Sequence, residues 1–306
     1  MKFPDIFKQR YEKIAKNPED FFSFLQKQLP RSFRINNLKA DKKIVLENFK
    51  EYGIEFEQYP WYSDAFKTND KKIGNTIEHF NGWIYIQEAT SMLPPLVLKD
   101  FLSEYSFVLD AAAAPGSKTT QLADLMNNKG LLIANEISYM RTKALKFNLE
   151  KMGVLNAVLT NYNFKGFPET IKFDLILVDA PCSSEGTLRK DPNIISTWSV
   201  KRINDFSKLQ KKMVLKAFDL LNPGGCLVYS TCTFAPEENE EVVDFLLQNT
   251  EAKIEKVSLE NFKLSSGIEE FQGKKFNADV KNACRIWPQD NDTDGFFLAK
   301  MRKEYV

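Results

Sequence analysis

From residue 105 onward, short apolar runs alternate with segments of helical periodicity. Such alternation predicts an α/β fold in which helices cover both faces of a mostly parallel sheet. The predicted strands are residues 106–110, 130–135, 155–160, 173–179 and 226–230, with a late edge strand at 295–300. The predicted helices are residues 118–126, 139–152, 202–221 and 237–248. Because ligands bind beyond the carboxyl ends of strands in such folds, we expect a functional site among the residues that follow each strand.

The first part of the chain has a different pattern. Residues 1 to about 70 combine short amphipathic helices with a strand-like stretch at 32–38, and they contain no glycine loop of the phosphate-binding type. The polar segment NDKKIGN, residues 69–75, is typical of a turn. We therefore expect a small α+β accessory module at residues 1–75 and a catalytic domain at residues 76–306.

Composition excludes two broad classes of protein. Apolar residues make up 43% of the 306 residues and charged residues 27%. A chain of this composition is too hydrophobic to be disordered. No apolar run approaches the roughly 20 residues that cross a bilayer, and residues 1–10 lack the apolar block of a signal peptide. We expect a cytoplasmic protein that acts as a monomer and has no membrane partner.

The cysteines and the histidine offer little to a metal ion. Cys182, Cys226, Cys232, Cys284 and the single histidine, His79, form no CxxC or His/Cys ligand spacing, so no metal site is expected. In a reducing compartment the four thiols are expected to be free. We expect Cys226 and Cys284 to be small buried hydrophobic residues, and His79 to be a surface residue without a catalytic role.

The overall charge does not favour a nucleic-acid partner. The chain has 42 Lys+Arg and 41 Asp+Glu and a net charge of +1, so a polyanion would need a local basic face. The candidates for such a face are Lys27, Arg31, Arg34, residues 39–43, Arg189 and Lys190. Taken alone, each is more simply explained as a solvated surface residue.

A turn of small residues, DAAAAPGSKT at 110–119, joins the first predicted strand to the first predicted helix. Small side chains let a ligand approach the backbone, and a helix N-terminus attracts a carboxylate. This suits the methionine end of S-adenosylmethionine, whereas the Walker and GxGxxG patterns are absent. The expected cofactor contacts in the turn are Ala112, Ala113, Ala114, Pro115, Gly116, Ser117 and Lys118.

Acidic residues end or follow two further strands. Glu136 follows the second strand, where a carboxylate can accept hydrogen bonds from both ribose hydroxyls of the cofactor. Asp179 ends the fourth strand and is a further candidate for the cofactor site. Each residue alone is a weak signal, since a carboxylate that caps the next turn would explain Asp179 equally well.

Two cysteines also follow strands. Cys182 lies in the DAPCS turn at 179–183, after the fourth strand, and Cys232 lies in the STCT turn at 230–233, after the next one. We therefore expect both thiols to point into one cleft. A lone cysteine is usually a small buried hydrophobic residue, but these two motifs favour a function.

Through these motifs the sequence resembles the RNA cytosine-5 methyltransferase family, and within it the bacterial 16S ribosomal RNA methyltransferases of the F type. The similarity extends from about residue 31 to residue 302 and includes IQEATSMLP at 86–94, AAAPGSKTTQ at 112–121 and MNNKG at 126–130. The resemblance implies the Rossmann-like sheet of class I methyltransferases that use S-adenosylmethionine, with an N-terminal module that binds RNA.

The resemblance also implies a reaction. Members of the family attack carbon 6 of cytosine with a thiolate, which makes carbon 5 able to accept the methyl group. Cys232 matches their nucleophile, and Cys182 matches the residue that serves product release. A free thiol is mostly protonated at neutral pH, and Lys118 matches the candidate for an assisting cation. Asp179 matches the residue that contacts N3 and the exocyclic amine of the base.

The sequence departs from the family pattern in two places. Asn163 stands where members usually carry an Asp that accepts a hydrogen bond from the adenine amino group, so we expect cofactor binding weaker by about 1 kcal/mol. Members of the F type have additional carboxyl-terminal domains, whereas this sequence stops soon after residue 303, which leaves the exact RNA target open. We expect 16S rRNA, free or within the small ribosomal subunit, with transfer RNA as the alternative.

An RNA substrate must offer a cytosine that leaves its stack, which is easiest in loops and bulges. The expected phosphate contacts are Arg31, Arg34, Lys39, Arg189 and Lys190. Trp61, Tyr62 and Trp198 could stack on bases, but burial in the core is the simpler expectation for them.

Two rival functions would use the same fold. A methyltransferase for small molecules or protein amides has no use for Cys232, and an amide enzyme needs an Asn/Asp-Pro-Pro-Tyr turn where this chain has DAPC at 179–182. A non-catalytic RNA-binding factor would be supported by loss of a cysteine or of the cofactor turn, and neither is lost.

Overall fold

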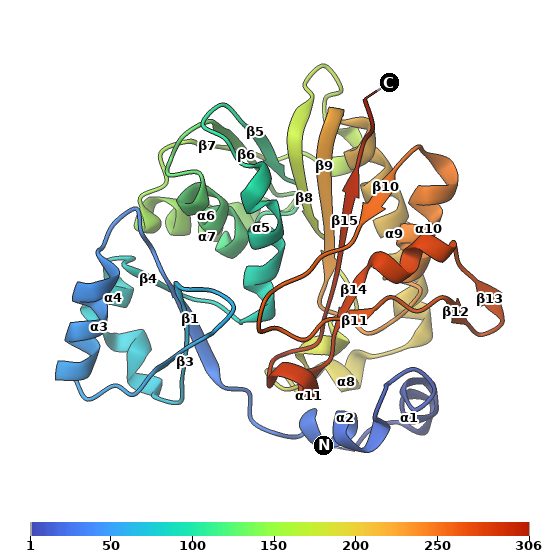
Figure 1. Ribbon diagram of the computed structural model, residues 1–306, viewed down its shortest axis with the longest axis horizontal. Helices are drawn as coiled ribbons and strands as arrows, with labels where there is room; N and C mark the ends of the chain where they lie inside the picture. Colours follow the sequence, from blue (N-terminus) through green and yellow to red (C-terminus); the bar gives the residue numbers. More distant parts are fainter. Residues whose placement is uncertain (1, 306) are drawn as a thin grey trace.

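The computed structural model describes residues 2–305, and at its centre lies a nine-stranded sheet (Figure 1). The strands follow the order β11-β14-β15-β9-β8-β5-β6-β7, and β10 pairs with β15. The five strands from β9 to β7 in this order run parallel to one another, and the remaining pairs are antiparallel. The parallel part is thus the α/β sheet that the apolar runs predict.

The strands of this sheet are β5 (Phe107–Asp110), β6 (Leu131–Asn135), β7 (Ala157–Thr160), β8 (Phe173–Asp179), β9 (Leu221–Thr231), β10 (Lys253–Glu255), β11 (Ser265–Ser266), β14 (Cys284–Ile286) and β15 (Phe296–Arg302). The helices around it are α5 (Leu93–Leu98), α6 (Ser117–Leu125), α7 (Tyr139–Met152), α8 (Ile194–Thr197), α9 (Val200–Asp219), α10 (Glu240–Asn249) and α11 (Pro288–Asn291). A separate hairpin consists of β12 (Glu270–Phe271) and β13 (Lys274–Lys275). Short 3-10 turns lie at η1 (Lys71–Asn75), η2 (Thr90–Met92), η3 (Lys99–Phe101), η4 (Phe164–Gly166), η5 (Glu185–Thr187) and η6 (Ala278–Asn282).

Both faces of the sheet are buried, as the continuous apolar runs require. Along β8, Ile176 and Val178 face a core shared with α9 and α10, whereas Leu175 and Leu177 face a second core shared with α5 and α6. Side chains alternate between the faces of a strand, so one strand serves two cores. The same burial accounts for two cysteines: Cys226 and Cys284 are 0% and 4% exposed, as predicted.

The last strand lies elsewhere than expected. The prediction of an edge strand at residues 295–300 is wrong, because β15 lies inside the sheet, between β9 and the strands β10 and β14. Four successive residues, Phe296 to Ala299, are buried, so both faces of β15 are covered as well as both edges. A run of this kind marks a central strand better than an edge strand.

The N-terminal part contains a small antiparallel sheet of its own, in the order β2-β3-β1-β4. Its strands are β1 (Arg31–Ile35), β2 (Glu57–Gln58), β3 (Ala65–Thr68) and β4 (Ile84–Ile86), and its helices are α3 (Lys42–Glu51) and α4 (Ile77–Phe80). The side chain of Asp41 accepts a hydrogen bond from the Lys43 N–H and so begins α3. The sheet includes β4, beyond residue 75, and the domain boundary at that residue stays a prediction.

The first two helices, α1 (Asp5–Tyr11) and α2 (Pro18–Phe24), lie away from this small sheet (Figure 1). They pack beneath the carboxyl-terminal half of the chain, where the rings of Tyr11 and Phe21 contact Phe234 and Phe21 also contacts Trp287. Full burial of a large apolar side chain stabilises a fold by about 1.5–3 kcal/mol. Helices α1 and α2 therefore cover apolar side chains of the carboxyl-terminal half of the chain. Among residues 2–305, no helix combines the length and apolarity that a bilayer crossing demands.

Candidate active site

Two thiols lie together at the carboxyl edge of the parallel sheet. β8 ends at Asp179, just before Cys182, and β9 ends directly before Cys232. The two strands are parallel neighbours in which Asp179 is paired with Ser230, so both turns leave the same edge. The Sγ atoms of Cys182 and Cys232 are 3.2 Å apart. The structure thus brings the two predicted thiols into one place.

The two thiols differ in acidity. The hydrogen bond from Cys182 is the main cause that lowers the pKa of Cys232, and the same bond raises the pKa of Cys182 well above its usual range. Burial and Asp179 act to raise the pKa of Cys232, whereas Ser184 and Lys118 act to lower it. Cys182 is buried and Cys232 is half-buried. The pair therefore favours a thiolate on the more accessible sulfur.

Lys118 and Asp179 form an ion pair beside the thiols. The Lys118 Nζ atom lies 2.6 Å from Asp179 Oδ2 and also donates to the Ser91 hydroxyl at 2.8 Å. The second carboxylate oxygen of Asp179 accepts a hydrogen bond from the Ser230 hydroxyl at 2.8 Å. Both oxygens of Asp179 are thus held by donors, which fixes the carboxylate as a hydrogen-bond acceptor.

The turn between β5 and α6 passes close to helix α7 at Gly116. Gly116 has φ +108°, and a Cβ atom there would lie 3.0 Å from Leu145 Cδ1. Asp110 at the end of β5 accepts a hydrogen bond from the Thr119 hydroxyl at 2.7 Å and so ties the strand to the helix. Burial is the main cause that raises the pKa of Asp110 to about 6.

A cavity of about 530 Å³ opens along this turn and reaches both cysteines. Ala112, Ala114, Glu136 and Asn163 line it. Glu136 follows β6, is 1% exposed, and accepts a hydrogen bond from the Ser138 N–H at 2.9 Å. Asn163 follows β7 and is exposed, and its side-chain oxygen accepts from the Lys165 N–H at 3.2 Å.

A second cavity, of about 400 Å³, adjoins the first and shares Asp179 and Cys232 with it. Its walls come from both parts of the chain, since residues 85–88 of the N-terminal part line it together with Lys118, Lys190 and Asp294. A small molecule in one cavity and a larger partner in the other would thus meet at the same thiol.

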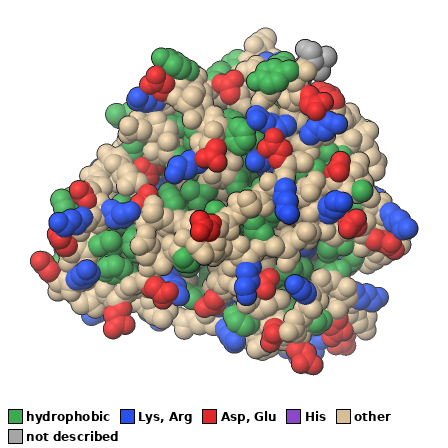
Figure 2. Space-filling model, viewed as in Figure 1, with side chains coloured by type: hydrophobic (Ala, Val, Ile, Leu, Met, Phe, Trp, Pro, Cys, Tyr) green, Lys and Arg blue, Asp and Glu red, His purple; other side chains and the backbone are tan. Residues whose placement is uncertain are grey.

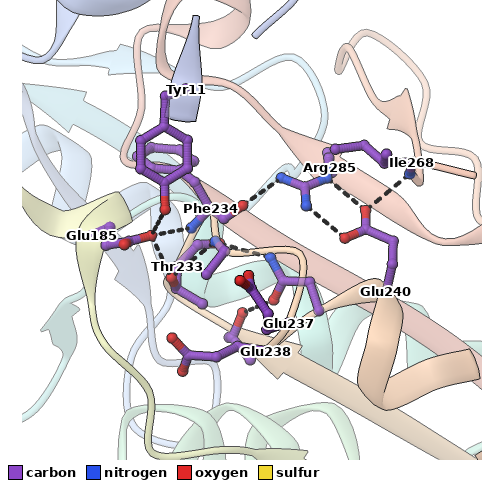
Figure 3. A network of polar contacts seen from close by, with 12 residues as sticks. Tyr11, Glu185, Thr233, Phe234, Glu237, Glu238, Glu240, Ile268 and Arg285 are labelled. Carbon is purple, nitrogen blue, oxygen red and sulfur yellow. Dashed lines mark hydrogen bonds and ion pairs between the residues drawn. The ribbon is translucent and has the colours of Figure 1, made fainter. Parts of the chain in front are cut away.

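A buried polar network supports the turn that carries Cys232 (Figure 3). Glu185, at the end of the DAPCS turn, accepts hydrogen bonds from the Tyr11 hydroxyl, the Thr233 hydroxyl at 2.8 Å and the Phe234 N–H at 3.3 Å. Nearby, Arg285 donates to both oxygens of Glu240, at 2.6 and 2.5 Å. Glu185 therefore joins the two cysteine turns to the first helix of the chain.

The predicted phosphate contacts fall into two groups. Arg34 and Arg189 are wrong as surface contacts, because they are 0% and 8% exposed. Arg34 donates to Gln87 at 2.9 Å and Thr120 at 2.6 Å, while Arg189 donates to the carbonyls of Lys27, Gln28 and Thr293. Arg31, Lys39 and Lys190 are exposed, and Lys190 lines the second cavity. Blue and red side chains are mixed over the face in Figure 2, without one broad basic patch there.

The three candidate stacking residues are largely used by the protein itself. Tyr62 is 7% exposed, and Trp61 packs against Phe262 with 5.3 Å between ring centroids. Trp198 packs on Phe7 and donates its indole N–H to Glu185. Burial, the simpler expectation, holds for Tyr62, and the other two are partly buried.

The sequence patterns did not identify three residues around the site: Asp294, Tyr11 and Glu185. Asp294 precedes β15, whereas the expected site residues were those that follow a strand. Tyr11 belongs to a short amphipathic helix, where an aromatic residue carries no signal of a distant partner. Glu185 follows the DAPCS turn closely, and its position in that motif is the one available clue.

Two family models match the chain. Residues 97–302 match the family described as 16S rRNA methyltransferase RsmB/F. Residues 3–89 match the N-terminal domain of 16S rRNA methyltransferase RsmF.

Curated relatives match nearly the whole chain. A tRNA (cytosine(49)-C(5))-methyltransferase of Pyrococcus abyssi is 46% identical over 96% of this chain and 94% of its own length. A ribosomal RNA small subunit methyltransferase F of Vibrio atlanticus is 42% identical over 98% of this chain, which spans 64% of that relative's length. Among solved structures, a methyltransferase homolog protein from Pyrococcus horikoshii is 34% identical, with a TM-score of 0.87 over 98% of this chain and 95% of its own.

Proposed function

This chain belongs to the 16S rRNA methyltransferase RsmB/F family, and from this premise we propose that it transfers a methyl group from S-adenosylmethionine to carbon 5 of a cytosine in structured RNA. The observation that carries the proposal is the pair of sulfur atoms 3.2 Å apart where two cavities meet. A methyl donor and a nucleobase need two adjoining sites with a nucleophile between them, and the two cavities share Cys232.

The larger cavity fits the parts of S-adenosylmethionine. The α6 N-terminus behind Gly116 suits the amino acid end of the cofactor, for which the resemblance adds Ala112, Ala113, Pro115, Ser117 and Lys118. The buried carboxylate of Glu136 can accept from the ribose hydroxyls, and the amide oxygen of Asn163 can accept from the adenine amino group. When bound, the cofactor supplies an electrophilic methyl group.

Cys232 is the proposed nucleophile. Its sulfur bonds to carbon 6 of the cytosine, and the electrons of the carbon 5–carbon 6 double bond then make carbon 5 able to take the methyl group. The lowered pKa of Cys232, caused first by the hydrogen bond from Cys182 and further by Ser184 and Lys118, favours the thiolate that this step needs. Asp179, held by Lys118 and Ser230, is placed to accept from the exocyclic amine.

Cys182 is proposed to serve the second half of the reaction. After methyl transfer, carbon 5 carries both the methyl group and its original hydrogen. That proton must leave so that the Cys232 Sγ–carbon 6 bond can break and the double bond can return. Cys182, 3.2 Å from the bonded sulfur, is within reach of the neighbouring carbon, and it would take the carbon 5 proton as a thiolate, after its own proton has passed to solvent.

The favoured target is 16S rRNA, because the matching family models over residues 3–89 and 97–302 both describe 16S rRNA methyltransferases. Transfer RNA is the second candidate, because the Pyrococcus abyssi relative, at 46% identity, is named for it. The N-terminal part, which lines the second cavity through residues 85–88, is proposed to bind the RNA. We further propose that the protein works in the cytoplasm as a monomer.

The test uses two variants and a map of methylated sites. C232A should abolish methylation and retain cofactor affinity, and C182A should accumulate a covalent protein–RNA complex, visible as a slow band on a denaturing gel. Bisulfite sequencing of ribosomal and transfer RNA from cells with and without the gene identifies the target. Turnover by C232A would contradict the nucleophile. The absence of a slow band for C182A, with an RNA that the wild-type protein methylates, would contradict the release role.

A further inference from the structure

Asp294 is a buried residue on the wall of the second cavity. It lies between α11 and β15, is 1% exposed, and lines the cavity together with Cys232 and Asp179. Neither of its side-chain oxygens has a hydrogen-bond partner anywhere in residues 2–305. Buried polar groups are nearly always bonded, so a carboxyl group with two unmet oxygens in a cavity points to a ligand that is still to come.

Two other carboxylates of this region, Glu240 and Asp179, differ from Asp294 because donors hold their oxygens. Glu240 is bonded twice by Arg285, and Asp179 is held by Lys118 and Ser230. Asp294 has no such donor, although the backbone around it is well fixed: its own N–H donates to Glu88 at 3.2 Å, and the Gly295 N–H donates to the Gly186 carbonyl at 2.9 Å. The backbone at Asp294 is thus held in place while the carboxyl group stays unbonded among the described residues.

The surroundings of Asp294 disfavour its negative form. Burial is the main cause that raises its pKa well above the usual range, and the charges of Glu88 and Cys232 raise it further. Lys190 and Arg189 act in the opposite direction. Arg189 is committed to Asp292 and to backbone carbonyls, so it forms no bond with Asp294. Two carboxyl groups in one cavity therefore have opposite roles open to them, Asp179 as an acceptor and Asp294 as a donor.

Resting on the methylation proposed above, we propose that Asp294 is a further catalytic residue, whose carboxyl hydrogen is donated to the N3 and O2 edge of the cytosine as Cys232 adds to carbon 6. The addition moves an electron pair from the ring double bond toward N3 and O2, where negative charge gathers. Asp179, bonded to Lys118, has no hydrogen to give there. Methyl transfer draws the electron pair back from this edge to carbon 5. Loss of the carbon 5 proton then re-forms the ring double bond as the Sγ–carbon 6 bond breaks, and the hydrogen stays with or returns to Asp294, so this residue ends unchanged.

The test measures the rate of adduct formation in the C182A background, in which release is blocked. D294A/C182A should form the adduct about 100-fold more slowly than C182A, the usual effect of losing one donor to a developing charge. D294N/C182A keeps an N–H donor and should be slowed by about tenfold at most. C182A should lose rate on the alkaline side as Asp294 loses its proton, and D294N/C182A should not. D290N/C182A, altered in α11 outside the cavity, is the matched control.

The outcomes distinguish the role of Asp294 from the proposed methylation on which it rests. An adduct in C182A at an unchanged rate in D294A/C182A would overturn the role of Asp294 and leave the nucleophile standing. A C182A rate that does not fall on the alkaline side would show that the reaction does not need the Asp294 proton, which also overturns the donor role. Absence of any adduct in C182A, with an RNA that the wild-type protein methylates, would contradict both proposals. Melting temperature and cofactor affinity are measured for each variant and should equal those of C182A. A collapse of the fold would lower both, so equal values exclude it as the cause of a slower rate.

Discussion

The Lys118 Nζ atom lies 2.6 Å from Asp179 Oδ2, and the same ammonium group contributes to the lowered pKa of the Cys232 thiol. One cation at the start of α6 thus acts on the last residue of β8, Asp179, and on Cys232, which follows β9. Because its side chain is only 9% exposed, its field is little screened by water. Loss of this charge should therefore affect both the orientation of the Asp179 carboxylate and the acidity of the Cys232 thiol.

Replacement of Lys118 by Gln should slow methylation by about 100-fold or more and shift the alkylation of Cys232 by iodoacetamide to higher pH. The shift follows because Lys118 acts to lower the pKa of Cys232, although the bond from Cys182 is the larger cause. Site-resolved mass spectrometry after timed alkylation measures it. K129Q, which removes the exposed partner of Glu104, is the matched control. An unchanged alkylation profile in K118Q would refute the electrostatic role.

Replacement of Tyr11 by Phe should lower the free energy of unfolding by about 1–3 kcal/mol, because Glu185 loses a buried donor. Denaturant titration measures the loss. Y139F, at a tyrosine that is 68% exposed, should change it by less than about 0.5 kcal/mol. Equal effects of the two variants would show that the contact of α1 with the cysteine turns contributes little.

Glu238 should make the protein less stable as the pH rises. Burial is the main cause that raises its pKa to about 8, from 4.5. Between these values the folded chain holds a proton that the unfolded chain has lost, so this contribution is fully present below about pH 4.5 and is lost as the pH rises through about 8. E238Q removes the titration, so its melting temperature relative to the wild type should be more favourable at pH 8.5 than at pH 5.5. The same difference at both pH values would contradict the assignment.

Replacement of Asn163 by Asp should tighten cofactor binding by about 1 kcal/mol, because a charge-assisted hydrogen bond to the adenine amino group is stronger than a neutral one. Calorimetry with S-adenosylhomocysteine measures the change, and N163A should bind more weakly than the wild type. Tighter binding by N163A would place the adenine elsewhere in the cavity.

The sequence predicted the sheet and the meeting of the thiols for a physical reason. Parallel strands buried on both faces are continuous apolar runs, and parallel neighbours end at one edge, so the turns after β8 and β9 had to meet. The bounds of β8 and α7 agree with the prediction residue by residue. These features depend on local patterns repeated along the chain.

Features that depend on distant partners were beyond such patterns. Arg34 and Arg189 look like surface cations in sequence, yet each is buried among acceptors that come from far along the chain. β15 looks like a last, outer strand, yet the chain inserts it beside β9. Asp294 gains its significance from the absence of donors around it, which only the folded structure reveals.

The contact between Tyr11 and Glu185 also constrains the order of events during synthesis. Helix α1 is made before Glu185 and Phe234, which its Tyr11 contacts in the folded protein. Until those residues are made, the apolar face of this amphipathic helix has no partner. A chain that ends before Glu185 would therefore expose the apolar face of α1, which the folded protein buries.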